Sequence, residues 1–276
     1  MRYLAILLAA LSSTAALGCG DDDDGGGSTD TDTDTDTDTD TDTDTDTDAD
    51  VAALEIAGEY DDAWSDFHVI TQSLWSMNLM GSFHIDSFDN DADYLVAQND
   101  SDNEYNPDLW SRFDWTVYEE GLYYCQIAYD AETAEDAEAA GPADATDPTT
   151  GGCGGYAWTE LTGFDLEIVG DYDDEWSDTH GITNDAWVTG LMGTFNVAAF
   201  YNTSDYLIAQ NDSDNEYNAD LWSRFDWTTY LDDLYYCQTA YDAATPVAAE
   251  DTTAPDNSDP TSGGCGGYAW TQLTPQ

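Results

Sequence analysis

The stretch NDSDNEYN occurs at 99–106 and again, unchanged, at 211–218, and its alternating carboxylates could hold a cation. Carboxylate oxygens are the ligands that Ca²⁺ prefers, but an EF-hand loop needs glycine at its sixth position, where this chain has Tyr105. A bidentate glutamate at the twelfth position is also missing, which leaves either a simpler calcium turn or an acidic hairpin connection. The candidate metal ligands are Asp100, Asp102 and Glu104 in the first copy and Asp212, Asp214 and Glu216 in the second.

A second duplicated stretch places a tryptophan among aspartates, in YDDAWSD at 60–66 and YDDEWSD at 172–178. An exposed ring beside a few polar groups suits a ligand site, for a sugar or a peptide. Trp64 and Trp176 are therefore candidate ligand-binding aromatics. The alternative for these two, as for most of the ten tryptophans, is packing in a core.

A third duplicated stretch, LWSRFDWT at 109–116 and 221–228, holds the only two arginines beyond Arg2, and the chain has no lysine. Alternate side chains of a strand share a face, so Arg112 lies on the same face as Asp114. A planar guanidinium suits a site that must meet a carboxylate and stack on an aromatic ring. We expect structural ion-pair nodes, Arg112 with Asp114 and Arg224 with Asp226; the alternative is an arginine that grips an anionic ligand.

Signatures of catalysis are weak. The chain has no GxSxG elbow, no HExxH pair and no glycine-rich phosphate loop. With 60 acidic residues, a pair that resembles the two carboxylates of a glycosidase carries no information. No catalytic residue is predicted, and an enzyme is the less favoured interpretation.

The three stretches belong to one repeat unit that occurs twice in the chain. Residues 54–162 align without a gap with residues 166–274 at an offset of 112, with 70 identities in 109 positions. Units of this length indicate tandem domains rather than a solenoid. Each unit is a series of short segments rich in aromatic and β-branched residues, separated by Gly, Asn, Asp and Pro clusters, which predicts seven or eight strands. In the first copy the candidate strands are 54–60, 68–71, 83–88, 93–98, 112–118, 122–129 and 156–161. The expected fold is all-β: two tandem antiparallel barrels or sandwiches.

The chain has five cysteines, and their positions indicate which of them form disulfides. Cys19 stands apart, and the other four are duplicated with the unit, which makes the pairing within each copy the economical one: Cys125 with Cys153 and Cys237 with Cys265. An even number in an exported chain favours disulfides over a metal site. No cofactor is required by any motif, and Ca²⁺ is the one candidate.

The N-terminal segment predicts export. Residues 1–18 have the pattern of a signal peptide, with one arginine, a short apolar run and small residues. Ala16-Leu17-Gly18-Cys19 resembles a bacterial lipobox, which makes Cys19 the candidate lipidation site; cleavage of an ordinary secreted protein is the alternative. Residues 19–50 include ten Thr-Asp pairs and, apart from Cys19 and Ala49, contain no apolar residue that could be buried. This composition predicts a disordered, lipid-anchored tether. The formal charge of −57 excludes nucleic acid as a partner.

The motifs WSRFDWT, LYYCQ-x-AYDA and GGCGGYAWT resemble a repeat found in exported lipoproteins of bacteria. The likeness covers residues 54–274 and implies export and a β-rich module, with no catalytic residues to transfer. The sequence thus predicts an extracytoplasmic lipoprotein, anchored at the outer membrane or cell surface. It would display two disulfide-stapled β domains for non-catalytic binding of a glycan or protein ligand, for adhesion or for surface structure. The alternative is a secreted polysaccharide hydrolase.

Overall fold

The computed structural model describes residues 52–276. The predicted signal peptide, the lipidation site Cys19 and the tether lie outside the described residues. Within residues 52–276 the fold is almost entirely β, as predicted, with two closed antiparallel sheets of eight strands each and two short helices.

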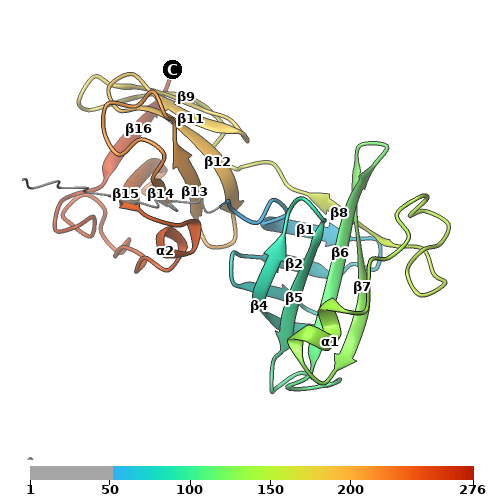
Figure 1. Cartoon of the computed structure of the whole chain (residues 1–276). Coiled ribbons are helices and arrows are strands. Elements are labelled where there is room, and N and C mark those ends of the chain that lie inside the picture. Colours follow the sequence, from blue (N-terminus) through green and yellow to red (C-terminus); the bar gives the residue numbers. More distant parts are fainter. Residues whose placement is uncertain (1–51) are drawn as a thin grey trace, which may run out of the picture. The chain divides into compact units, whose positions relative to one another are not determined.

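The first sheet is an up-and-down barrel, in which each strand pairs with the next and the last returns to pair with the first (Figure 1). Closure leaves no strand edge exposed, which removes the sites where a sheet could pair with another chain. Its elements are β1 (Gly58–Asp62), β2 (Phe67–Ile70), β3 (Leu74–Met77), β4 (Gly81–Asp89), β5 (Tyr94–Asn99), β6 (Trp110–Tyr118), β7 (Gly121–Ala131), α1 (Ala134–Glu138) and β8 (Thr159–Gly163).

The second sheet repeats this order and closes in the same way, since its last strand pairs with its first. Its elements are β9 (Gly170–Asp174), β10 (Thr179–Ile182), β11 (Ala186–Thr189), β12 (Gly193–Tyr201), β13 (Tyr206–Asn211), β14 (Trp222–Tyr230), β15 (Asp233–Ala243), α2 (Pro246–Glu250) and β16 (Thr271–Pro275). The offset of 112 found in the sequence is therefore an offset between equivalent strands.

The structure settles the choice between barrel and sandwich in favour of the barrel, and it differs from the sequence prediction at two segments. The segment 54–60 was expected to be a strand, but the strand begins at Gly58, and Leu54 and Ile56 reach the core from a turn. The strand β3 was not predicted, because LWSM is only four residues long and contains no β-branched residue.

The interior of each barrel is aromatic. On β6, Phe113 and Trp115 are buried and alternate with Arg112 and Asp114, which lie on the outer face, as strand geometry requires. The ring of Phe113 packs 4.7 Å from that of Trp75 and 5.0 Å from that of Phe83. In the second barrel Phe225 packs in the same way, 4.7 Å from Trp187 and 4.9 Å from Phe195. Edge and offset contacts at these separations stabilise each pair by about 0.5–1.5 kcal/mol beyond the burial itself.

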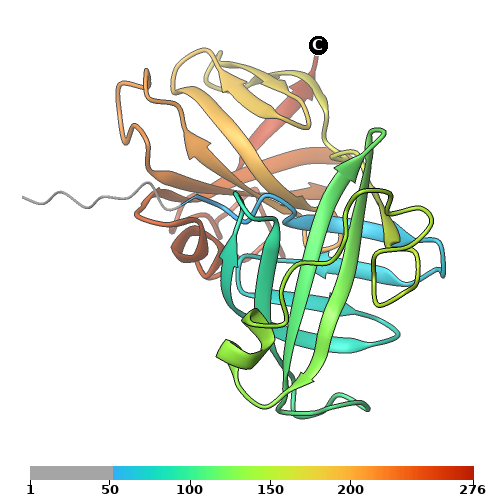
Figure 2. The same ribbon diagram turned by 45° about the vertical axis from the view of Figure 1, so that its right-hand side comes forward.

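The connections of an up-and-down barrel alternate between its two ends. The β1–β2, β3–β4 and β5–β6 turns and the long β7–β8 connection therefore share one end, which we call the mouth. The helix α1 belongs to the β7–β8 connection and packs against the outer face of β5, β6 and β7 (Figure 2). Each of the duplicated motifs YDDxWSD and NDSDNEYN, and the loop that holds Cys153, lies in a connection at the mouth.

Candidate functional site

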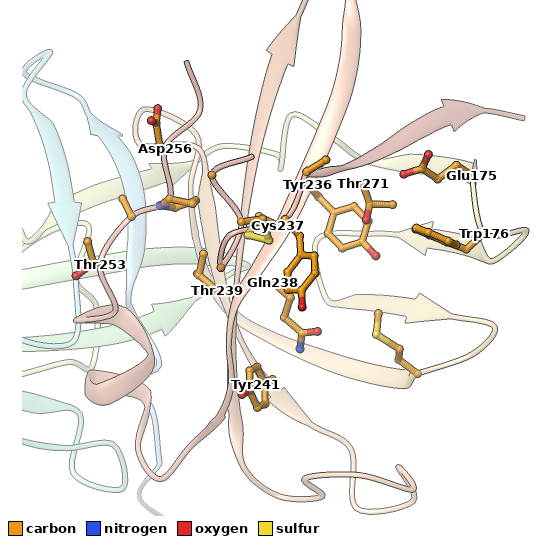
Figure 3. Close-up of a pocket in the computed structure, with 18 residues that line it drawn as sticks. Glu175, Trp176, Tyr236, Cys237, Gln238, Thr239, Tyr241, Thr253, Asp256 and Thr271 are labelled. Atoms are coloured by element: carbon orange, nitrogen blue, oxygen red, sulfur yellow. A yellow bond between two sulfur atoms is a disulfide. The ribbon is translucent and has the colours of Figure 1, made fainter. Parts of the chain in front are cut away.

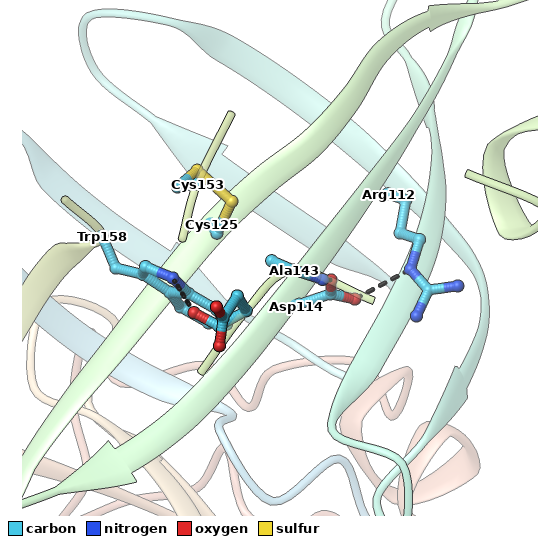
Figure 4. The surroundings of a disulfide bond; sticks show 7 residues. Arg112, Asp114, Cys125, Ala143, Cys153 and Trp158 are labelled. Atoms are coloured by element: carbon cyan, nitrogen blue, oxygen red, sulfur yellow. Dashed lines mark hydrogen bonds and ion pairs between the residues drawn. A yellow bond between two sulfur atoms is a disulfide. The ribbon is translucent and has the colours of Figure 1, made fainter. Parts of the chain in front are cut away.

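The arginine on β6 clamps the long β7–β8 connection to the barrel (Figure 4). Arg112 donates from Nε to Asp114 Oδ1 at 2.8 Å and from Nη1 to the carbonyl of Glu138 at 2.7 Å. Its guanidinium lies 4.1 Å from the centre of the Tyr94 ring, and Asp114 accepts a second hydrogen bond from the backbone N–H of Ala143 at 2.7 Å. The arginine thus satisfies a carbonyl at the end of α1, where helix geometry leaves carbonyls without partners.

The second barrel has the same clamp. Arg224 donates from Nη2 to Asp226 Oδ1 at 2.8 Å and from Nη1 to the carbonyl of Glu250, at the end of α2, at 2.6 Å. Its guanidinium stands 4.0 Å from the centre of the Tyr206 ring. The side chains of Arg112 and Arg224 are only 6% and 7% exposed, and each guanidinium is already paired with a buried aspartate and a backbone carbonyl. This geometry favours a structural role over a grip on an anionic ligand.

In each barrel a disulfide fixes the same connection as the arginine does. Cys125 on β7 is bonded to Cys153, and Cys237 on β15 is bonded to Cys265, which confirms the predicted pairing within each copy (Figure 4). The indole of Trp158 donates to the carbonyl of Asp144 at 3.2 Å, inside the loop that the disulfide closes. The β7–β8 connection is therefore fixed by a disulfide, an indole and an arginine.

The two NDSDNEYN loops do not gather the predicted metal ligands. Asp100 accepts from the backbone N–H of Asp102 at 2.8 Å and contacts His84 Nε2 at 2.7 Å, and these contacts lower the pKa of its carboxyl, the N–H of Asp102 most. Asn103 accepts from the backbone N–H of Ser82 at 2.8 Å and donates to the carbonyl of Ser82 at 2.7 Å, which fixes the loop to the start of β4. Oxygens of Asp100, Asp102 and Glu104, or of their counterparts Asp212, Asp214 and Glu216, do not come within 4.8 Å of one another as a set.

A different set of acidic residues converges in the β9–β10 turn. Asp174, Asp178 and His180 each bring one ligand atom within 4.8 Å of the others, the one such group in the described part of the chain. Its counterpart in the first barrel is Asp62, Asp66 and His68, where His68 Nε2 lies 3.5 Å from Asp62 Oδ2. His68 is fully buried, and burial lowers the pKa of its imidazole, while Asp66 and Asp62 oppose the shift.

Hydrogen bonding of the histidine argues against a metal at this group. The indole N–H of Trp75 donates to His68 Nδ1 at 3.1 Å, and that of Trp187 donates to His180 Nδ1 at the same distance. An indole can only donate, so Nδ1 carries the lone pair and Nε2 carries the proton. Metal-bound imidazole normally has the reverse pattern, in which the nitrogen away from the metal donates its N–H. The Nε2–H of each histidine therefore faces a carboxylate: Nε2 lies 3.5 Å from Asp62 Oδ2 in the first barrel and 3.4 Å from Asp174 Oδ2 in the second.

The same aspartates shape the turn that displays the tryptophan. Asp62 Oδ1 accepts from the backbone N–H groups of Trp64 and Asp66, both at 2.8 Å, and Ser65 takes the left-handed conformation with φ of 64°. This turn leaves Trp64 76% exposed, and the equivalent turn leaves Trp176 71% exposed. Neither ring is used by the core, so both remain free to contact a ligand.

A hollow lies beside each exposed tryptophan. In the first barrel it has a volume of about 290 Å³, and in the second it measures about 950 Å³ and extends along the loop at Thr253–Asp256 (Figure 3). Residues at equivalent positions line both hollows, and the disulfide is part of each. In the first barrel these are Trp64, Met80, Tyr124, Gln126 and Thr159, with Cys125–Cys153; in the second they are Trp176, Met192, Tyr236, Gln238 and Thr271, with Cys237–Cys265.

The floor of the hollow belongs to the core. Tyr124 packs 5.1 Å from Trp75, and burial raises the pKa of its phenol well above the usual value. The structure thus places the predicted aromatics Trp64 and Trp176 at two equivalent hollows, with partners that sequence reasoning missed. One sequence signal could have found Met80 and Met192: both copies carry Leu-Met-Gly in the turn after the third strand, where Gly, Pro, Asn, Asp and Ser are the usual residues.

Among residues 52–276, neither helix has the length and apolar character required to cross a bilayer. Comparison with family models, with curated proteins and with solved structures gives no match for this chain.

Proposed function

We propose that the protein is an extracytoplasmic binding protein that captures a ligand at the mouth of each barrel and does not transform it. The observation that carries this proposal is the repetition of one hollow in both barrels, each with an exposed tryptophan at its side. An apolar hollow with a few polar groups is the common form of a ligand site. Two copies on one chain would raise the avidity for a ligand that presents repeated groups.

Location outside the cytoplasm is supported by the two disulfides, which persist in oxidising compartments. We further propose that Cys19 carries a lipid and that residues 19–50 act as a tether between the membrane and the first barrel. These two statements rest on the sequence pattern alone. Calcium is not part of the proposal, because the predicted ligand sets do not converge.

Array binding tests the proposal. The full-length protein is applied to glycan and peptide arrays, and the double variant Trp64→Ala/Trp176→Ala is applied in parallel. We expect retention of a ligand by the wild type and its loss in the double variant, with an unchanged melting temperature because both rings are exposed.

A matched control removes exposed apolar surface elsewhere. Val117 and Leu231 are 72% and 79% exposed and lie at the opposite end of their barrels from the mouth, so Val117→Ala/Leu231→Ala should bind as the wild type does. Retention of every array ligand by the tryptophan variant would contradict the proposal. Release of reducing ends from a bound polysaccharide would contradict the absence of catalysis.

A further inference from the structure

The hollow of the first barrel is acidic. Asp62 and Asp66 line it, and both are nearly inaccessible to solvent, with 4% of the Asp62 side chain and 3% of Asp66 exposed. The chain has no lysine, and the two arginines of its described part are bonded to Asp114 and Asp226 on the outer faces of the barrels. No basic side chain of residues 52–276 is therefore free to neutralise the hollow.

The histidine beside these carboxylates cannot neutralise them either. His68 holds its proton on Nε2 and accepts the indole N–H of Trp75 at Nδ1. A second proton would have to displace that hydrogen bond in a fully buried site. The Nε2 atom of His68 has no close hydrogen-bond partner among the described residues. The imidazole thus adds no positive charge to the group, and a cation that entered the hollow would be attracted to its two carboxylates.

The walls of the hollow determine which kind of cation fits. Trp64, Met77, Leu79, Met80 and Tyr124 supply aromatic and apolar surface. A hydrated metal ion gains nothing from such walls, because Ca²⁺ and Mg²⁺ require oxygen ligands around them. An ammonium or guanidinium group gains both from carboxylates and from the face of an indole. The combination in this hollow therefore suits an organic cation.

The hollow continues along the barrel. A second hollow of about 260 Å³ shares Met80 and Gln126 with the first and is bounded by the exposed rings of Tyr105 and Tyr129. In the second barrel a single hollow includes the equivalents Trp176, Gln238 and Tyr241, with Glu175 and Asp256 as its carboxylates. A small free amine would fill only one part of this surface, whereas an extended chain would contact all of it.

We propose that the mouth of each barrel binds a basic side chain, arginine or lysine, of an extended partner polypeptide. The cation would lie between the exposed tryptophan and the carboxylates, and the neighbouring residues of the partner would follow the surface toward Tyr129 or Tyr241. This inference rests on the proposed function and specifies the ligand class.

The test compares two peptides that differ only in charge. The peptide acetyl-Gly-Arg-Gly-Arg-Gly-amide and its analogue with citrulline in place of both arginines are titrated into the full-length protein in about 150 mM NaCl, which screens diffuse attraction to an acidic surface. Spermidine and the neutral sugar cellohexaose are titrated in parallel. We expect binding of the arginine peptide, none of the citrulline peptide, and a loss of about 5- to 30-fold in affinity in Trp64→Ala/Trp176→Ala.

A pair of charge variants distinguishes the effect of the carboxylates at the mouth from that of the overall negative charge of the protein. Asp66→Asn/Glu175→Gln and Asp136→Asn/Asp232→Asn each remove two negative charges, the first pair at the hollows and the second pair on exposed surface elsewhere. The amide that replaces the carboxylate of Asp66 would still offer an oxygen to the backbone N–H of Leu79, which donates to Asp66 at 2.9 Å. The first variant should weaken binding of the arginine peptide clearly more than the second.

Each other outcome overturns the inference in a distinguishable way. Equal binding of the two peptides, or equal effects of the two charge variants, would show that the hollows do not select a cation. Tighter binding of spermidine than of the arginine peptide would show that the ligand is a free amine. Binding of cellohexaose that depends on Trp64 and Trp176, without binding of the arginine peptide, would overturn this inference and leave the proposed function intact. No binding of any probe or array ligand would overturn both.

Discussion

Replacement of Arg112 by alanine should unfold the first barrel at a markedly lower temperature. The side chains of Arg112 and Asp114 are 6% and 5% exposed and are joined at 2.8 Å. Alanine would leave the Asp114 carboxylate buried without its cation and would free the carbonyl of Glu138 at the end of α1. Removal of one partner of a buried pair typically costs about 3–5 kcal/mol.

The size of the expected shift follows from the size of the domain. For a domain of about 100 residues, 1 kcal/mol lowers the melting temperature by about 4–8 °C. The transition of the first barrel should therefore fall by about 12 °C or more. Differential scanning calorimetry of the full-length protein measures this shift, and proteolysis of the segment 132–158 should accelerate in parallel, because the arginine holds that segment to β6.

Two further variants complete the design. Arg112→Lys keeps a positive charge but loses the planar fork that meets Asp114 and Glu138 together, so a smaller loss is expected. Asp136→Asn changes an exposed residue of α1 and should alter stability by less than about 0.5 kcal/mol. A loss below about 1 kcal/mol in Arg112→Ala would refute the clamp and favour an arginine that serves a ligand.

Three other predictions concern stability and cations. First, His68 has a lowered pKa in the folded protein, so the unfolded state binds the additional proton more readily and stability should fall as the pH drops below about 6.5 toward the folded pKa. Urea denaturation of His68→Gln should show a weaker pH dependence than the wild type in this window, and identical profiles would be inconsistent with a neutral buried imidazole. Second, replacement of Cys125 and Cys153 by serine should destabilise the first barrel by about 3.5 kcal/mol, since the bond spans 28 positions of sequence; an unchanged urea midpoint would count against the staple. Third, millimolar calcium should raise the melting temperature no more than magnesium at equal concentration, because the NDSDNEYN carboxylates do not converge; a rise specific to calcium would restore the predicted turn site.

The parts of the fold that could be predicted are those set by local pattern and by duplication. Alternation along WSRFDWT predicts that Arg112 and Asp114 share one face of a strand, and the structure has this arrangement; which face lies inside the barrel, that of Phe113 and Trp115, is known only from the structure. The offset between the copies selects the disulfide pairing, which the structure confirms. Closure of the barrel was not predictable, because it depends on the pairing of β1 with β8, which lie at opposite ends of the unit, and a sandwich would have the same strand pattern.

The candidate site shows the same limit. Trp64 could be singled out from its acidic neighbours, but the hollow beside it is built by three connections of the barrel together with residues of its strands, and only the fold brings Met80, Gln126 and Thr159 together. The alternating carboxylates at 99–106 suggested a cation site. In the structure, the carboxylate of Asp100 accepts a hydrogen bond from the backbone N–H of Asp102 in its own loop, and Asn103 binds the backbone of Ser82. Hydrogen bonds within the protein thus take the place of metal coordination.

The most direct test of ligand capture at the mouths is the response of the ten tryptophan indoles. Each indole N–H gives its own signal in a nitrogen–proton correlation spectrum, and single substitutions assign them. During titration with the arginine peptide or with an array ligand, the signals of Trp64 and Trp176 should shift most, while those of the buried Trp75 and Trp187 should remain in place. Shifts confined to other tryptophans, or none while ligand binds, would show that the ligand is held elsewhere and would contradict the account.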